Sequence, residues 1–174
     1  MIVAAAFGEK VLNLGATKLI AAILLIQLVA IGGAYLMSAM ARRFGNIKVL
    51  LLVVSMWIFI CIAAYFLKTE LQFYGMAFMV GVMMGGIQAL SRSTYSKLLP
   101  ADIEDTTAFF SFYDVTEKLA IVFGLFTFGI IEQLSHNIRF SALFLTVFFI
   151  IGFILLFRVL KFNSLLIQKE QQHD

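Results

Sequence analysis

Three charged side chains interrupt one of the most apolar stretches of the sequence, "FFSFYDVTEKLAIVFGLFTFGII". Asp114 and Lys118 are four residues apart and Glu117 follows Asp114 by one turn, so all three project from one side of a helix. Only thirteen apolar residues separate Lys118 from Glu132, about 20 Å of helix, which is too short to cross a bilayer. The three charges therefore belong within the membrane-spanning helix. Because a charge there costs on the order of 3 kcal/mol, we expect the cluster to face protein or a water-filled cavity.

The preceding apolar stretch ends in a polar stripe that can pair with this cluster. In "GGIQALSRSTYSKLLP", Gln88 and Arg92 are four residues apart on one side of a helix. The short turn "LLPADIED" makes the two helices antiparallel and places Arg92 at the depth of Asp114. We predict that the two polar faces line one wall of an internal cavity, with Arg92 opposite Asp114 or Glu117 and with Lys118 balancing the charge. The chemistry would be solute binding or gating.

Other interpretations of these charges stay open. They could form a purely structural ion-pair network that locks the two helices together, and Arg92 could instead extend its side chain to the lipid headgroups. The cations Arg92 and Lys118 favour ionised carboxylates nearby. We therefore interpret Asp114 and Glu117 as gating or salt-bridge residues first and as proton carriers second.

Small residues recur every four positions along the helix that carries Gln88. Gly81, Gly85 and Ala89 form a small-xxx-small pattern, which allows two membrane helices to approach closely. We predict that this surface packs against a neighbouring helix, and specifically that it brings the next helix, at 105–131, close to Arg92.

The composition places these residues in a membrane protein. Of 174 residues, 62% are hydrophobic and only 13% are charged, and the mean hydropathy is +1.00. The sequence predicts an all-α membrane fold in a single domain over residues 1–174. Residues 1–8 form the outer end of a partial helix. Five membrane-spanning helices follow, at about 17–41, 47–67, 73–99, 105–131 and 138–161.

Several function classes are excluded by what the sequence lacks. Cys61 is the only cysteine, and His136 and His173 have no ligand partners nearby, so neither a metal site nor a cofactor is predicted. No nucleophile and base pair suggests an enzyme. The net charge of +3 is explained by membrane topology rather than by nucleic acid, for which there is no basic domain.

Lys and Arg residues are unevenly divided between the two sides of the membrane. Eight lie at or next to the loops at 42–46 and 100–104 and the C-terminal tail, against four on the other side. Because positive residues concentrate in cytoplasmic loops, the C-terminus is predicted to be cytoplasmic. The expected location is the cell (inner) membrane, with several spans.

The loop "ARRFGNIK" resembles the signature Gly-x-x-x-Asp-Arg-x-Gly-x-(basic) of the major facilitator superfamily. Arg43 and Gly45 agree with it, whereas Ser38 replaces the glycine and Arg42 the aspartate. The charge relay attributed to that aspartate therefore does not carry over. A tight turn here needs the glycine, and Arg42 and Arg43 are expected to bind the headgroups of membrane lipid.

Longer passages resemble the vacuolar amino-acid effluxer family, the autophagy-linked branch of that superfamily, and its bacterial relatives. These are "GGIQALSRSTYSKLLP", "FFSFYDVTEKLAIVFGLFTFGII" and "AAAFGEKVLNLGATKLI", with Leu125 departing from an expected proline. The resemblance maps the chain onto the C-terminal half of a twelve-helix transporter that works by alternating access on small solutes such as amino acids. It implies that the spans at 17–41, 73–99 and 105–131 surround the cavity. The spans at 47–67 and 138–161 would face lipid.

Three hypotheses about function follow. The chain could be the C-terminal half of a carrier, completed by a missing N-terminal half or a second subunit. It could instead be a membrane interaction module that does not transport, or a truncated, inactive fragment of a carrier.

Overall fold

A computed structural model describes residues 2–99 and 106–170. These residues form six helices and no strand, which confirms the predicted all-α class. The helices are α1 Ile2–Leu12, α2 Ala16–Phe44, α3 Asn46–Phe66, α4 Glu70–Leu98, α5 Thr106–Ser135 and α6 Ile138–Glu170. The partial helix expected at 1–8 runs on to Leu12, and α6 runs beyond the expected end at residue 161. The expected loop at 100–104 lies outside the described residues.

Four of these helices are long and apolar enough to cross a membrane, judged by length and composition: α2, α3, α4 and α6 up to Phe162. The remaining expected span corresponds to α5, which is 30 residues long and carries Asp114, Glu117 and Lys118 in its N-terminal half. It is not among the four, so its crossing of the membrane stays a prediction.

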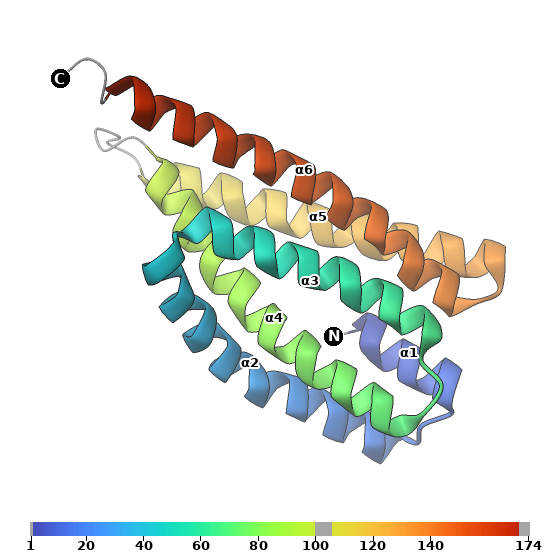
Figure 1. The fold of residues 1–174 in the computed structure, drawn as a ribbon. Coiled ribbons are helices and arrows are strands. Elements are labelled where there is room, and N and C mark those ends of the chain that lie inside the picture. The colour runs from blue at the N-terminus through green and yellow to red at the C-terminus, as the bar shows by residue number, and fades with distance from the viewer. Residues whose placement is uncertain (1, 100–105, 171–174) are drawn as a thin grey trace.

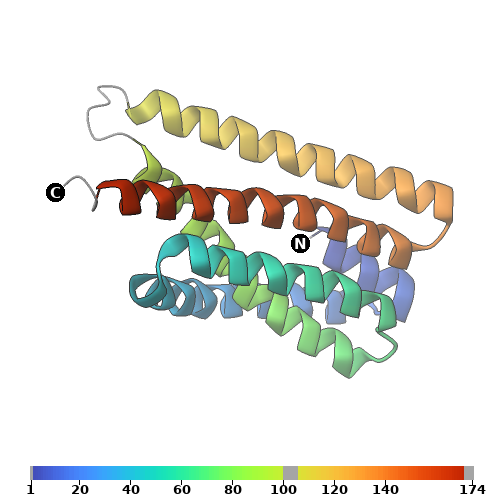
Figure 2. The ribbon, with the colours of Figure 1, turned by 45° about the horizontal axis from the view of Figure 1, so that its top comes forward.

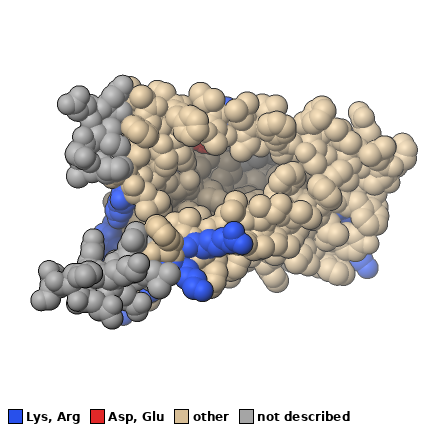
Figure 3. Space-filling view, turned by 90° about the horizontal axis from the view of Figure 1, so that it is seen from above, with Lys and Arg blue, Asp and Glu red and all other residues tan. Residues whose placement is uncertain are grey.

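The long helices run antiparallel in sequence order (Figure 1). The α2–α3 turn, the end of α4, the start of α5 and the end of α6 lie at one end of the bundle, and α1 lies toward the other (Figure 1). The second view separates α5 as an outer helix above α6, with α3 and then α4 and α2 below (Figure 2). Seen from above, the face over α5 and α6 is hollowed between these two helices (Figure 3).

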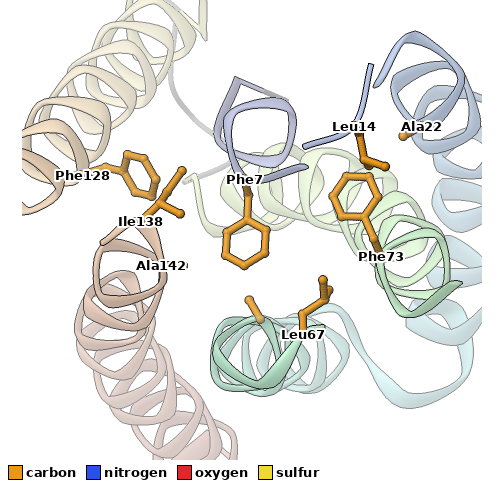
Figure 4. Packing of buried hydrophobic residues seen from close by; sticks show 9 residues of the cluster. Phe7, Leu14, Ala22, Leu67, Phe73, Phe128, Ile138 and Ala142 are labelled. Atoms are coloured by element: carbon orange, nitrogen blue, oxygen red, sulfur yellow. The ribbon is translucent and has the colours of Figure 1, made fainter. Parts of the chain in front are cut away.

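Two hydrophobic clusters hold the described bundle together. The first lies near α1, where Phe7 points toward α3 and Phe73, Phe128 and Ile138 converge from three other helices (Figure 4). The second joins α2, α3 and α4 through side chains such as Met37, Val53, Met83 and Leu90. Burial of such side chains excludes lipid and fixes the relative positions of the helices.

The expectation that the span at 47–67 faces lipid on all sides is wrong, because only one side of α3 is exposed. Nine of its residues are buried against its neighbours, and the Val53 side chain is 0% exposed. Its exposed large side chains form a single stripe, Leu52, Met56, Phe59, Ile62 and Phe66. A helix that is apolar all round suits a protein interior as well as lipid, so composition alone could not separate the two.

A capping box starts α4, the helix that carries the polar stripe. The Gln72 backbone N–H donates to Thr69 Oγ1 over 3.3 Å, and the Thr69 backbone N–H donates to Gln72 Oε1 over 3.2 Å. Each bond satisfies a backbone donor that the first helical turn leaves unpaired.

Replacing this cap should weaken the start of α4. Thr69→Ala is expected to lower the free energy of unfolding by about 1 kcal/mol, because it leaves the Gln72 N–H without its acceptor. Thermal unfolding in detergent, followed by circular dichroism, measures the change. Thr17→Ala is the control, since Gly15 rather than Thr17 is the N-cap of α2. Equal effects of the two substitutions would contradict the assignment.

Candidate functional site between α4 and α5

A close contact with α2 fixes the position of the polar stripe on α4. A Cβ atom added to Gly81 would lie 2.8 Å from the Ile26 carbonyl oxygen, and one added to Gly85 would overlap the Ala30 carbonyl. Gly33 of α2 faces the Val82 backbone in the same way. The predicted packing role of Gly81 and Gly85 is therefore confirmed.

The partner of this glycine surface differs from the prediction. The glycines pack against α2 rather than α5. Ala89, the third residue of the pattern, lines a pocket. The four-residue spacing identifies a surface that permits close approach, but it does not specify which helix approaches. The sequence reasoning also missed Gly33, although the pair "GG" at 32–33 in an apolar helix was a usable signal.

The predicted ion pair between α4 and α5 is present. Arg92 Nη2 donates to Asp114 Oδ1 over 2.8 Å and to Oδ2 over 3.1 Å. The two side chains are 56% and 50% exposed in the described bundle, so the pair lies on an open face. The Arg92 guanidinium also lies 5.8 Å from the centre of the Phe110 ring, at a distance where cation–π attraction operates. The predicted common depth of Arg92 and Asp114 is thus confirmed.

Aromatic side chains support this pair on both helices. The hydroxyl groups of Tyr113 and Ser91 are 2.7 Å apart and hydrogen-bonded, and the Tyr95 hydroxyl donates to the Phe109 carbonyl over 3.1 Å. The Tyr95 ring lies 5.0 Å from that of Tyr113 and 5.9 Å from that of Phe110, centre to centre. These contacts join the two helices around the ion pair. Sequence reasoning gave no role to Phe110 and Tyr113 of α5.

A pocket of about 560 Å³ lies beside the ion pair. Its wall consists of one side of α4 with a single ring from α5: Gln88, Ala89, Arg92, Ser93, Ser96 and Phe110. The lining residues thus combine amide, hydroxyl and guanidinium side chains with an aromatic ring, and most of the accessible surface is apolar. Such a surface can bind a small solute that has both polar and apolar parts.

Two of the expected site residues are not brought to this pocket. Glu117 and Lys118 are exposed on α5, and neither lines the pocket. Arg92 is paired with Asp114 rather than with Glu117. The prediction grouped the charges of positions 92, 114, 117 and 118. Among the residues that the structure describes, only the Arg92–Asp114 pair lies beside the pocket. Glu117 and Lys118 share the side of α5 that carries Asp114, but they lie about 4.5 and 6 Å further along the helix, beyond the contacts with α4.

The loop between α2 and α3 is connected to the same stripe. Gly45 has a φ of 91°, which favours glycine, and its N–H donates to the Ala41 carbonyl over 2.9 Å. Asn46 Nδ2 donates to Ser93 Oγ over 3.1 Å, and Lys97 Nζ donates to Asn46 Oδ1 over 3.0 Å. Asn46, which sequence reasoning did not single out, therefore links this loop to the pocket wall.

The basic residues of this loop remain available to lipid. Arg42 and Arg43 are both exposed, and the Arg43 guanidinium lies 5.6 Å from the centre of the Phe44 ring. Their headgroup contacts stay a prediction. Among the described residues no group of three or more metal-ligating side chains could hold a metal ion.

These features define a class of protein. An apolar helical bundle with several potential membrane spans, a tight glycine crossing and an ion pair beside a pocket is a polytopic α-helical membrane protein. The sequence matches the model of the family described as vacuole effluxer Atg22 like over residues 1–164, and the chain belongs to this family.

Known relatives agree with this assignment. The chain is 30% identical over 160 residues to the uncharacterized MFS-type transporter YxiO of Bacillus subtilis, with 92% of this chain and 37% of the relative covered. It is 32% identical over 169 residues to autophagy-related protein 22 of Cryptococcus neoformans, covering 88% of this chain and 29% of the relative. For the same-named protein of Eremothecium gossypii the identity is 37% over 103 residues, covering 59% and 19%. The chain thus spans about a third or less of these relatives' length, and no solved structure matches it.

Proposed function

We propose that this chain is the C-terminal part of a secondary transporter that moves small solutes, such as amino acids, across the membrane by alternating access. The Arg92–Asp114 ion pair beside this pocket is the observation that carries the proposal. Charged side chains are costly in membrane-spanning helices. An ion pair on an open helix face therefore favours a surface that binds a solute or moves. The names of the family and of its relatives, vacuole effluxer and MFS-type transporter, support the same conclusion.

The geometry suggests how a solute would bind. Both hydrogen bonds to Asp114 come from one guanidinium nitrogen, Nη2, so the other N–H groups of Arg92 can receive the carboxylate of a solute. Gln88 and Ser96 offer an amide and a hydroxyl for its other polar groups, while Phe110 offers an apolar surface. The bound carboxylate shares the positive charge of Arg92 with Asp114, so solute binding would weaken the ion pair between α4 and α5.

The exposed charges of α5 fit a role in assembly and gating. Glu117 and Lys118 are exposed on α5, and contact with lipid would be costly for them if α5 spans the membrane. In our proposal they face a preceding N-terminal half, or a second subunit, that closes the cavity from the other side. The end of the bundle that carries Arg42, Arg43 and the end of α6 would face the cytoplasm, in the cell membrane.

Transport in proteoliposomes tests the proposal. The chain alone, and the chain joined to the preceding part of the Bacillus subtilis relative, are reconstituted and assayed for counterflow of a panel of radiolabelled amino acids. We expect saturable uptake of at least one of them by one of the two preparations. Arg92→Gln should lower that uptake by more than tenfold, because one charge-assisted interaction of about 1.5–3 kcal/mol is lost.

Arg158→Gln is the matched control, since Arg158 is exposed on α6 and does not line the pocket. It should leave uptake within about twofold of the original rate, the usual scale of a surface substitution. Uptake by neither preparation, or equal uptake by the Arg92 variant and the unchanged chain, would overturn the proposed function.

A further inference from the structure

A second pocket lies at the other end of the bundle from the Arg92–Asp114 pair. It has a volume of about 660 Å³ and is formed by the last turn of α1 together with the turn between α5 and α6. Its lining is mostly polar and is drawn from three helices: Lys10, Val11, Gly129, Glu132, Gln133, His136, Asn137, Ile138 and Arg139. Neither the ion pair nor the glycine crossing described above contributes to it.

The side chains of this pocket carry an excess of positive charge. Lys10 of α1 forms an ion pair with Glu132 of α5, which among the described residues is the only carboxylate in the lining. Arg139 Nη1 donates to the Tyr65 carbonyl oxygen over 2.7 Å, which anchors the guanidinium through a neutral acceptor. Because no lining carboxylate remains for Arg139, one positive charge in the pocket is not neutralised by the lining.

The backbone adds to this positive potential. Asn137 caps α6, since the Arg139 backbone N–H donates to Asn137 Oδ1 over 3.0 Å. The N-terminus of a long helix carries a partial positive charge, and here it opens at the pocket. Gln133 and His136 supply further polar groups to the same space.

We propose that this pocket is a binding site for the carboxylate of a small, water-soluble solute. Arg139 and Lys10 hold the carboxylate, and the polar side chains around them bind the remainder of the molecule. The polar lining favours a soluble molecule over the acyl chain of a lipid. The site is separate from the Arg92 pocket, and binding here requires no transport. The binding proposal can therefore be tested independently of the proposed function.

Binding of a carboxylate here has a structural consequence. The incoming group competes with Glu132 for Lys10, which is the ion pair that ties α1 to α5. Occupation of the pocket therefore loosens α1 from the turn between α5 and α6.

Succinate is a suitable probe, with succinamide as its neutral counterpart. The chain has two histidines, so His173→Gln leaves His136, in the pocket lining, as the only one. The variant chain is labelled with 13C-histidine, placed in nanodiscs of neutral lipid and titrated while the His136 ring signal is followed by NMR. We expect a saturable shift with succinate and none with succinamide.

Two substitutions test the pocket in different ways. Lys10→Met removes a cation, and Gln133→Glu adds a carboxylate to the lining while the Lys10–Glu132 pair is kept. Each should weaken succinate binding by about tenfold, the effect of one charge-assisted hydrogen bond. Lys68→Met is the matched control: it removes an exposed cation at the turn between α3 and α4, outside the lining, and should leave binding unchanged.

Several results would overturn the proposal. One is a shift that does not saturate, or one that succinamide produces equally. Another is an equal loss of binding in the Lys68 and Lys10 variants, because it would reveal a general charge effect. A third is a signal that responds only to anionic lipid, such as phosphatidylglycerol in the nanodisc, because a headgroup would then be the occupant.

Discussion

Gly85→Ala is expected to separate α2 from α4 and to lower the free energy of unfolding by about 3 kcal/mol or more. The added Cβ atom would overlap the Ala30 carbonyl group. That group belongs to the backbone of α2, so no side-chain rotation can relieve the contact and one helix must move. Overpacking of a fixed interior typically costs about 1–3 kcal/mol, and the cost is higher where backbone must shift. Displacement of α4 would also disturb the pocket beside Arg92.

Gly75→Ala provides a control on the same helix. Gly75 is exposed, and a Cβ atom added there meets nothing within 4 Å. Because alanine favours helix over glycine, this variant should be as stable as the original chain or slightly more stable. Unfolding of both variants in detergent, titrated with denaturant and followed by circular dichroism, measures the difference. Equal stability of the two variants would show that α2 and α4 do not cross at Gly85.

Exchanging the charges of the ion pair is expected to separate its structural role from its role in transport. Arg92→Asp alone leaves Asp114 without its partner and places a second carboxylate near it, which should cost about 1 kcal/mol of stability because both side chains are half-exposed. Adding Asp114→Arg restores an ion pair between the same two positions with the charges exchanged. The double variant should recover most of the lost stability. The double variant should still transport at least tenfold more slowly, because the pocket wall of α4 then presents an acid to the solute carboxylate.

Both quantities are needed to interpret this exchange. Thermal unfolding in detergent reports the stability, and counterflow in proteoliposomes reports the transport rate. Arg158→Asp, which places a negative charge on the exposed side of α6, controls for a general effect of charge. If the double variant transports at the original rate, the pair only locks α4 to α5, which is the structural alternative that the sequence left open.

The sequence determined those features that depend on distances along the chain. The rise of a helix and the length of a turn fix depth in an antiparallel pair, so Arg92 could be matched to Asp114 without coordinates. The glycine spacing identified the close-packing surface of α4 for a similar reason, because residues four apart share one side of a helix. The all-α membrane class followed from composition and from the lengths of the apolar stretches.

Only the tertiary structure decided which surfaces meet. An apolar helix face packs equally well against protein or lipid, so the sequence could not show that α4 crosses α2, or that most of α3 is buried. Lys10 and Glu132 are 122 residues apart, and their pairing depends on how α1 docks beside α5. Depth along a helix is set by local geometry, whereas the choice of neighbour is set by the summed packing of the whole bundle.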